Sequence, residues 1–213
     1  MKKQLLVAVA STVLAGSAMA QSAFEGFYGQ IGVGYESVSP SYSGGTVSTP
    51  PTRTAYTASA DNANGFTGNV GLGYNFALSP GFLLGIGAEY APLESSSANY
   101  TLRVPSVNTS VVGKYKKSNS YNVFLAPGIV IDKDKLVYVK VGYSGMSVKA
   151  DSDTYNYTGM SAGLGYKQMI SGSLYGFAEV NYAKYGDQNM GAGATGTSNA
   201  NVTNALVGIG YKF

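Results

Sequence analysis

The chain has 213 residues, including 29 glycines and 18 tyrosines, and its formal net charge at pH 7 is +3. It contains no cysteine, histidine or tryptophan, which excludes a disulfide framework and any metal site built from imidazole or thiolate ligands. The small net charge gives no reason to expect a nucleic-acid partner, and the aromatic content is unlike that of disordered chains.

Residues 1–20 have the pattern of an export signal. Two lysines precede an apolar segment at residues 5–14, which is too short for a membrane-spanning helix. The cleavage pattern of small residues consists of Ala18, Ala20 and Gln21. We therefore predict that residues 1–20 are removed and that residues 21–213 form the mature domain. Loss of the two lysines lowers its formal net charge to +1.

Eight segments of the mature chain alternate between apolar residues and small or polar ones, which is the two-residue period of a strand with one apolar face. Pro127, inside the fourth segment, removes one ladder hydrogen bond and predicts a bulge or bend. The predicted strands cover about residues 27–38, 65–78, 82–91, 120–131, 136–148, 157–167, 174–183 and 202–213.

A Gly-x-Gly-Tyr motif recurs in these strands, at residues 32–35, 71–74, 163–166 and 208–211, and residues 140–143 are a variant that begins with lysine. Each copy puts glycine on one face and an aliphatic residue with tyrosine on the other. A soluble sandwich with glycines at bulges is one explanation. A narrow barrel, with a small inner wall and tyrosines at the membrane interface, is the explanation favoured by the shared phase of the copies.

The connections between the predicted strands alternate in length. Tight turns lie near residues 79–81, 132–135 and 171–173, whereas polar connections cover residues 37–64, 92–118, 149–156 and 186–201. Outer-membrane barrels have short periplasmic turns and long external loops. We therefore predict an all-β fold, an eight-stranded antiparallel up-and-down transmembrane β-barrel. A soluble barrel with an internal ligand is the alternative, but the second face of the strands is too polar for an apolar cavity.

The hairpin of residues 126–143, the segment 163–179 and the terminal Gly210-Tyr211-Lys212-Phe213 resemble the small outer-membrane barrels of the opacity-protein, OmpX and OmpA-membrane-domain group. The resemblance implies an integral protein of the outer membrane of a Gram-negative bacterium. It also implies that Ile209, Tyr211 and Phe213 form a terminal signal for the barrel-assembly machinery. Enzymes among such barrels rely on a histidine, which this chain lacks, so we expect no enzymatic activity, cofactor or metal.

Four charged residues of the predicted strands face the lumen: Glu89, Lys140, Lys167 and Glu179. Charges inside a narrow barrel should pair, because an unpaired buried charge is costly. We predict a plug of salt bridges in which Lys140 and Glu179 are partners. The alternative is a narrow path for ions. Leu206 also faces the lumen and should contact another apolar side chain, such as Phe124 or Phe177.

The connections 37–64 and 92–118 are rich in Ser, Thr, Tyr and Asn, a composition that suits adaptable polar contacts. We predict a structural role in the envelope together with adhesion or recognition of a surface or host ligand through these two connections. A narrow channel for small or apolar solutes is the alternative function. Residues 191–196 match a Gly-x-Gly-x-x-Gly pattern, but no strand precedes and no helix follows it, so no nucleotide site is expected.

Overall fold

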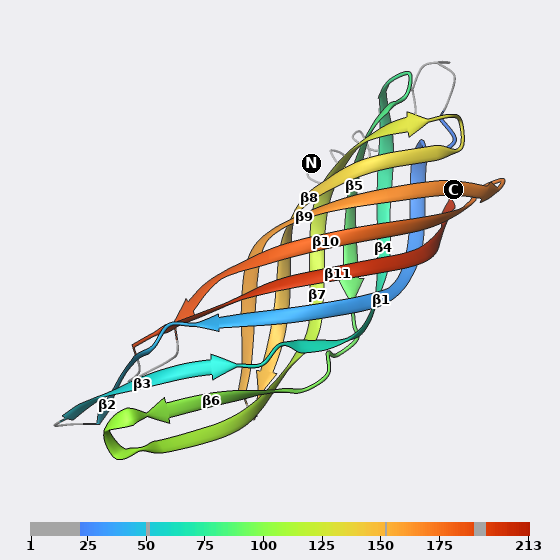
Figure 1. The fold of residues 1–213 in the computed structure, drawn as a ribbon. Coiled ribbons are helices and arrows are strands. Elements are labelled where there is room, and N and C mark those ends of the chain that lie inside the picture. Colours follow the sequence, from blue (N-terminus) through green and yellow to red (C-terminus); the bar gives the residue numbers. More distant parts are fainter. Residues whose placement is uncertain (1–21, 50–51, 152, 190–194) are drawn as a thin grey trace, which may run out of the picture.

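The computed structural model describes residues 22–49, 52–151, 153–189 and 195–213, and the predicted signal lies outside these residues. The described chain is almost entirely antiparallel strands (Figure 1). No described helix has the length and apolar character needed to cross a membrane. The strands are β1 Gly26–Tyr42, β2 Gly45–Thr49, β3 Thr52–Ala60, β4 Ala63–Ser79, β5 Phe82–Ala91, β6 Ala98–Val104, β7 Thr109–Ile131, β8 Lys135–Ala150, β9 Asp153–Ser171, β10 Leu174–Asn189 and β11 Thr197–Lys212, with a 3₁₀ turn at Pro105–Val107.

Eight of these strands close into a barrel. Their order is β7-β5-β4-β1-β11-β10-β9-β8, and β8 pairs back with β7. The last strand pairs with the first over their whole length, from Tyr28 opposite Lys212 to Tyr42 opposite Ser198. A closed ring leaves no unpaired sheet edge, which is the condition for strands to cross a bilayer. The predicted eight-stranded barrel is confirmed.

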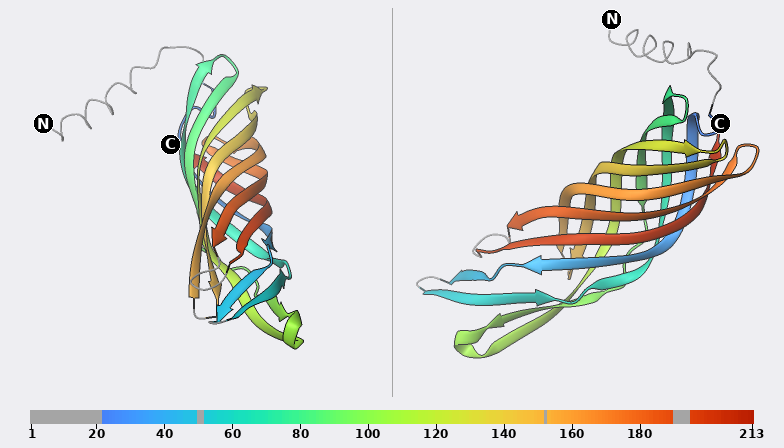
Figure 2. Two further views of the ribbon diagram at one scale, coloured as in Figure 1. Left: turned by 90° about the vertical axis from the view of Figure 1, so that its left-hand side faces the viewer. Right: turned by 45° about the horizontal axis from the view of Figure 1, so that its top comes forward.

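A second sheet region extends the barrel at one end. The hairpin β2–β3 joins β6, which pairs with the first residues of β7, Thr109–Tyr115. This extended end lies opposite the terminal end, where β1 begins and β11 finishes (Figures 1 and 2). Much of the predicted connections 37–64 and 92–118 is therefore strand, an ordering that the sequence left open. The segment Thr52–Ala60 is rich in Thr, which favours strands, but has no continuous apolar face to create a periodic pattern.

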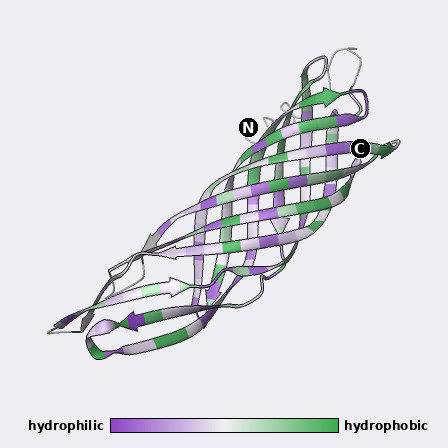
Figure 3. Ribbon diagram, in the orientation of Figure 1, coloured by the Kyte–Doolittle hydropathy of each residue, from purple (hydrophilic) through white to green (hydrophobic). Residues whose placement is uncertain are grey.

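The outer surface of the barrel is apolar. Phe66 is 83% exposed and Leu72 is 69% exposed, and apolar and polar residues alternate along the barrel strands (Figure 3). Aromatic side chains gather at two levels of this surface. At one level Tyr90 lies opposite Tyr121, and at the terminal end Tyr211 and Phe213 make a ring contact of 5.4 Å between centroids. Lipid covers such a surface, with aromatic residues at its two interfaces.

The register of the strands corrects one local prediction. Leu125 pairs with Val141 and Gly128 pairs with Tyr138, so β7 and β8 keep one register through Pro127. Of the predicted bulge or bend, the bulge is wrong, because a missing N–H removes a bond without inserting a residue. Register shifts occur instead near strand ends, at Lys117/Asn119 and Tyr185/Gln188 toward the extended end and at Ala77/Ser79 and Leu174/Tyr175 toward the terminal end.

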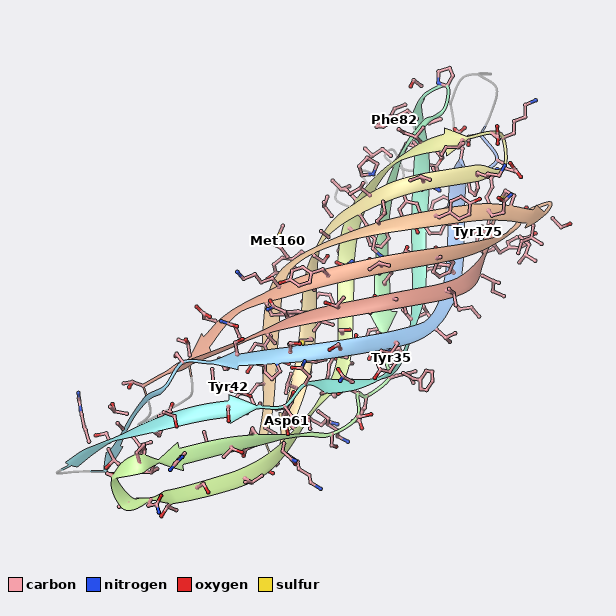
Figure 4. All side chains as sticks on the ribbon, viewed as in Figure 1. Tyr35, Tyr42, Asp61, Phe82, Met160 and Tyr175 are labelled. Carbon is pink, nitrogen blue, oxygen red and sulfur yellow. The ribbon has the colours of Figure 1, made fainter. Side chains whose placement is uncertain are left out.

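The interior of the barrel holds an apolar cluster near the terminal end. Leu206 is buried in the same cluster as Phe124 and Phe177, which confirms the expectation for this side chain. The inner wall is narrow, because a Cβ at Gly210 would overlap the ring of Tyr175. The glycines of the recurring motif therefore make room for large rings that cross the lumen (Tyr175, Figure 4).

Candidate functional site

Lys167 lies in the half of the lumen nearer the terminal end, against three tyrosine rings. Its Nζ is 3.9 Å from the centroid of the Tyr28 ring, 4.9 Å from Tyr175 and 5.2 Å from Tyr138. Among the described residues no carboxylate lies within ion-pair distance of it. The π faces of the rings attract the ammonium group instead. The structure therefore holds Lys167 beside the predicted charge network and outside its salt bridges.

The other three predicted lumen charges meet at one point. Lys140 Nζ on β8 is 2.7 Å from Glu179 Oε2 on β10 and 2.9 Å from Glu89 Oε2 on β5. All three side chains are at least nine-tenths shielded from solvent. One ammonium group thus joins carboxylates from two non-adjacent strands across the lumen. We call Glu89, Lys140 and Glu179 the charge triad.

Neutral groups complete the hydrogen bonds of the charge triad. The Tyr138 hydroxyl donates to Glu179 Oε1, and Gln30 Nε2 donates to Glu89 Oε1 at 3.4 Å. Gln30 in turn accepts from the Tyr175 hydroxyl at 3.1 Å. Such additional bonds offset the desolvation of buried charges. Two of the three tyrosines that surround Lys167, Tyr138 and Tyr175, therefore also support the triad.

A second buried ion pair, which the sequence reasoning missed, lies nearer the extended end. Lys117 on β7 pairs with Glu36 on β1, and their side chains are 1% and 5% exposed. The predicted charge network did not include Glu36, and Lys117 lies in the predicted connection 92–118. The bulge between Lys117 and Asn119 breaks the two-residue period at this point. A bulge adds one residue and so shifts the two-residue pattern by one position. Inward positions of β7 counted separately on each side of the bulge would have included Lys117.

A polar cavity of about 60 Å³ lies between the charge triad and the Glu36–Lys117 pair. Asn122 Oδ1 accepts hydrogen bonds from Ser144 at 3.0 Å and Ser161 at 2.8 Å. Asn69 Oδ1 and Asn181 Oδ1 have no partner among the described protein atoms. A space of this size and polarity suits a few water molecules that would satisfy such oxygens. The lumen is therefore polar at its middle and crossed by ionic contacts on both sides.

The extended end carries an exposed ion cluster outside the barrel wall. Glu94 accepts hydrogen bonds from Lys116 at 2.5 Å and from Lys149 at 3.2 Å. These bonds lower the pKa of the Glu94 carboxyl below its usual value. Because the cluster is exposed, solvent screening leaves it little effect on stability. No group of residues that could hold a metal ion occurs in the described part of the chain.

The three residues of the predicted assembly signal lie on the outer face of the last strand or at its end. Ile209, Tyr211 and Phe213 are all exposed large hydrophobic residues. The Phe213 amide donates to the Phe27 carbonyl at 2.9 Å, which fixes the chain end to β1. The residues of the predicted cleavage site, Ala18, Ala20 and Gln21, lie outside the described residues.

A sequence profile of the outer membrane protein beta-barrel domain matches residues 6–213. The chain belongs to that family. It is thus an integral protein of the outer membrane, as its sequence predicted. Short turns at the terminal end then face the periplasm, and the extended end faces the outside of the cell.

Solved outer-membrane proteins have the same fold. OprG of Pseudomonas aeruginosa has a TM-score of 0.53 and 15% identity, over 89% of this chain and 96% of that protein. Neisserial surface protein A has a TM-score of 0.54 and 15% identity, over 89% and 98%. The protease OmpT of Escherichia coli has a TM-score of 0.51 and 10% identity, over 93% and 100%. No curated protein matches the chain. At these identities the likeness concerns the fold alone.

Proposed function

We propose that the protein stabilises the outer membrane and recognises a surface or host ligand through its extended end. The observation that carries the proposal is the sheet extension of β2, β3, β6 and the first part of β7, which continues the barrel beyond the membrane. Membrane anchoring alone does not require these strands, because the eight-stranded ring is already closed without β2, β3 and β6. Their side chains are mainly Ser, Thr, Tyr and Asn, which suit adaptable contacts.

Whole-cell adhesion tests this proposal. In one variant, residues 43–60 and residues 97–113 are each replaced by a short Gly-Ser turn, which removes the extension and keeps the barrel strands. A matched control replaces residues 190–194, a connection at the same end. We expect adhesion to fall only in the first variant. Heat-modifiable gel mobility verifies that both barrels are folded. Equal adhesion of both variants would overturn the proposal.

A narrow channel is the second candidate function, and the polar cavity of about 60 Å³ is the observation that favours it. Against it, the charge triad and the Glu36–Lys117 pair cross the lumen on either side of that cavity. Planar-bilayer recording separates plug from path. We expect no conductance in the wild type and none in Glu179→Gln. Steady conductance that changes in the variant would support the channel instead.

Two further expectations complete the proposal. The apolar residues Ile209, Tyr211 and Phe213 would be read by the barrel-assembly machinery. In that case Phe213→Ala lowers assembly in cells but not refolding of the purified protein into detergent. Export would remove residues 1–20, so that the mature protein begins at Gln21, which mass spectrometry of the membrane form would test. The absence of enzymatic activity stays a prediction.

A further inference from the structure

A cavity of about 200 Å³ lies at the extended end, outside the membrane part of the barrel. Strands β1, β3, β6, β7, β8, β9 and β11 all contribute to its wall. Five of the lining residues are tyrosines and the others are small, aliphatic or hydroxylated. None of the described residues that line the cavity is charged. We call this cavity the mouth pocket. Its five tyrosines are Tyr42, Tyr100, Tyr115, Tyr155 and Tyr157.

Hydrogen bonds made by the hydroxyl groups hold three of these five rings in place. Tyr100 donates to Asp151 Oδ2 at 2.6 Å, Tyr157 and Ser198 share a bond of 2.8 Å, and Tyr115 donates to the Asp61 carbonyl. None of the five rings stacks on another aromatic ring or carries a lysine or arginine, as far as the described residues show. The ring faces are therefore not used by the protein's own aromatic or cationic groups.

The electrostatic surroundings of the mouth pocket favour a positive guest. The charged groups that act on Tyr100 are Asp151 and Asp153, and the group that acts on Tyr115 is Asp61. The bond to Asp151 raises the pKa of Tyr100 to about 12, and burial raises the pKa of Tyr42 to about 12, so both phenols stay neutral. Neutral rings present negative π faces, and nearby carboxylates add to the same potential.

The same protein already contains an occupied site of this kind. At the terminal end the ammonium group of Lys167 lies 3.9–5.2 Å from three tyrosine centroids and has no carboxylate partner among the described residues. Tyrosine rings therefore hold a cation in this lumen without a direct ion pair. The mouth pocket gathers more rings of the same type, but no side chain of the described residues fills it.

We infer that the mouth pocket binds an organic ammonium ion, of the quaternary type found in a choline head group. Methylated ammonium groups are weakly hydrated and need no hydrogen-bond acceptors, so aromatic faces suffice to bind them. A primary ammonium would have to give up strong hydration to enter a pocket with few acceptors. The pocket is somewhat larger than a cavity of about 150 Å³ that holds benzene, which suits a trimethylammonium group with a short chain.

This inference rests on the proposed function, because it names the chemistry that the extended end would recognise. A choline head group displayed on a cell surface would meet the mouth pocket from outside. Binding of the free head group does not require the rest of the extension to contact a partner. The two proposals can therefore fail separately.

Calorimetric titration of the purified protein tests the inference. The protein is placed in nanodiscs of phosphatidylglycerol, so that neither lipid nor detergent supplies choline. Choline is compared with its neutral carbon isostere, dimethylbutanol, and with methyl glucoside. We expect a millimolar Kd for choline and a Kd about tenfold higher for the isostere, since the cation–π difference is on the order of one factor of ten. Empty nanodiscs provide the background.

Two double variants separate ring faces from hydroxyls. Tyr42→Leu with Tyr155→Leu removes two faces and should raise the Kd for choline about fivefold or more. Tyr42→Phe with Tyr155→Phe keeps the faces and should stay within about twofold. Tyr143→Leu, on the outer surface, is the matched control and should have no effect. If the leucine pair does not fold, as gel mobility would show, Tyr157→Leu alone takes its place.

Three results would overturn the inference. Equal affinity for choline and dimethylbutanol would make the mouth pocket merely apolar. Preference for methyl glucoside would make it a sugar site. No binding of any probe at about 50 mM would exclude a site of useful affinity. Choline binding together with unchanged adhesion of cells that lack the extension would instead count against the proposed function alone.

Discussion

The two ends of the lumen use tyrosine in opposite ways. Near the terminal end, Tyr28, Tyr138 and Tyr175 surround Lys167, and Tyr138 and Tyr175 also support the charge triad, so the protein fills its own interior. At the extended end five tyrosines line the mouth pocket, and no lysine of the described residues lies over their rings. The difference shows how one residue type serves stability where the lumen is narrow and offers a binding surface where the strands leave the membrane.

The lumen and the mouth pocket also differ in the number of charged side chains that they contain. The lumen contains three carboxylates and three ammonium groups among its described residues, from Glu36, Glu89, Glu179, Lys117, Lys140 and Lys167. The described residues that line the mouth pocket include none, and the Asp151 carboxylate at its edge accepts a hydrogen bond from Tyr100. Paired opposite charges favour a closed lumen, whereas the carboxylate at the edge of the mouth pocket favours a positively charged ligand.

Removal of the triad's only cation should have the largest effect on stability. Lys140→Met leaves Glu89 and Glu179 buried without a positive partner, and we expect a loss of about 3–5 kcal/mol in the free energy of unfolding. Urea unfolding in lipid vesicles, followed by tyrosine fluorescence because the chain has no tryptophan, measures it. The control is Lys135→Met, which breaks an exposed pair and should cost less than about 1 kcal/mol.

A compensated variant sharpens this measurement. Lys140→Met combined with Glu89→Gln and Glu179→Gln removes the whole triad, and we expect it to recover much of the lost stability, because no uncompensated charge remains. Equal loss in the single and the triple variant would show that packing of the lysine stem, rather than charge, sets the cost.

The narrow inner wall should produce the next largest effect. Gly210→Ala places a Cβ against the Tyr175 ring, and we expect a loss of about 1–3 kcal/mol from overpacking in the same unfolding assay. Gly186→Ala is the control, because the nearest atom to a Cβ there is the Thr158 oxygen at 3.6 Å. A neutral result at Gly210 would mean that the rings in the lumen can move aside.

The sequence predicted the membrane part of this fold because two environments act on it. Lipid outside and a crowded lumen inside force a strict two-residue alternation, which is visible in residues 65–78 and 202–213. The same alternation put Glu89, Lys140 and Glu179 on one face. It could not say that Lys167 would meet rings rather than a carboxylate, since the pattern gives the face of a residue but not its depth relative to other strands.

The extension could not be predicted in the same way. The strands β2 and β3 consist mainly of hydroxylated and small residues, and β6 alternates only over Tyr100, Leu102 and Val104, so the pattern is too short to mark membrane strands. Lys117 was missed because a bulge interrupts the alternation next to it. The mouth pocket depends on strands far apart in the sequence, from Tyr42 to Ser198, and only the closed ring brings them together.

Removal of Lys167 should cost less than removal of Lys140, although both are buried lysines. Lys167→Met removes the contacts with the tyrosine rings but does not leave a carboxylate without its ion-pair partner. We therefore expect a loss of about 1–2 kcal/mol in the free energy of unfolding. The unfolding assay used for Lys140→Met gives the comparison directly. A loss as large as that for Lys140→Met would contradict the distinction between a cation held by rings and a cation held by carboxylates.

The smallest effect concerns proton binding at the mouth pocket. The hydrogen bond from the Tyr100 hydroxyl to Asp151 raises the pKa of Tyr100 to about 12, from an ordinary value of 10.0. The near-ultraviolet absorbance difference between the wild type and Tyr100→Phe should therefore titrate near pH 12, and Asp151→Asn should move that titration toward 10.0.

The sign of the linked stability follows from this shift. A phenol whose pKa is raised on folding contributes stability that is complete below pH 10.0 and is lost as the pH rises toward about 12. Tyr100→Phe should remove that part of the alkaline loss and leave stability at neutral pH nearly unchanged. If Tyr100 titrates near 10.0 in the folded wild type, the Asp151 carboxylate does not act on this ring, and the negative rim on which the ammonium site depends would lose one of its members.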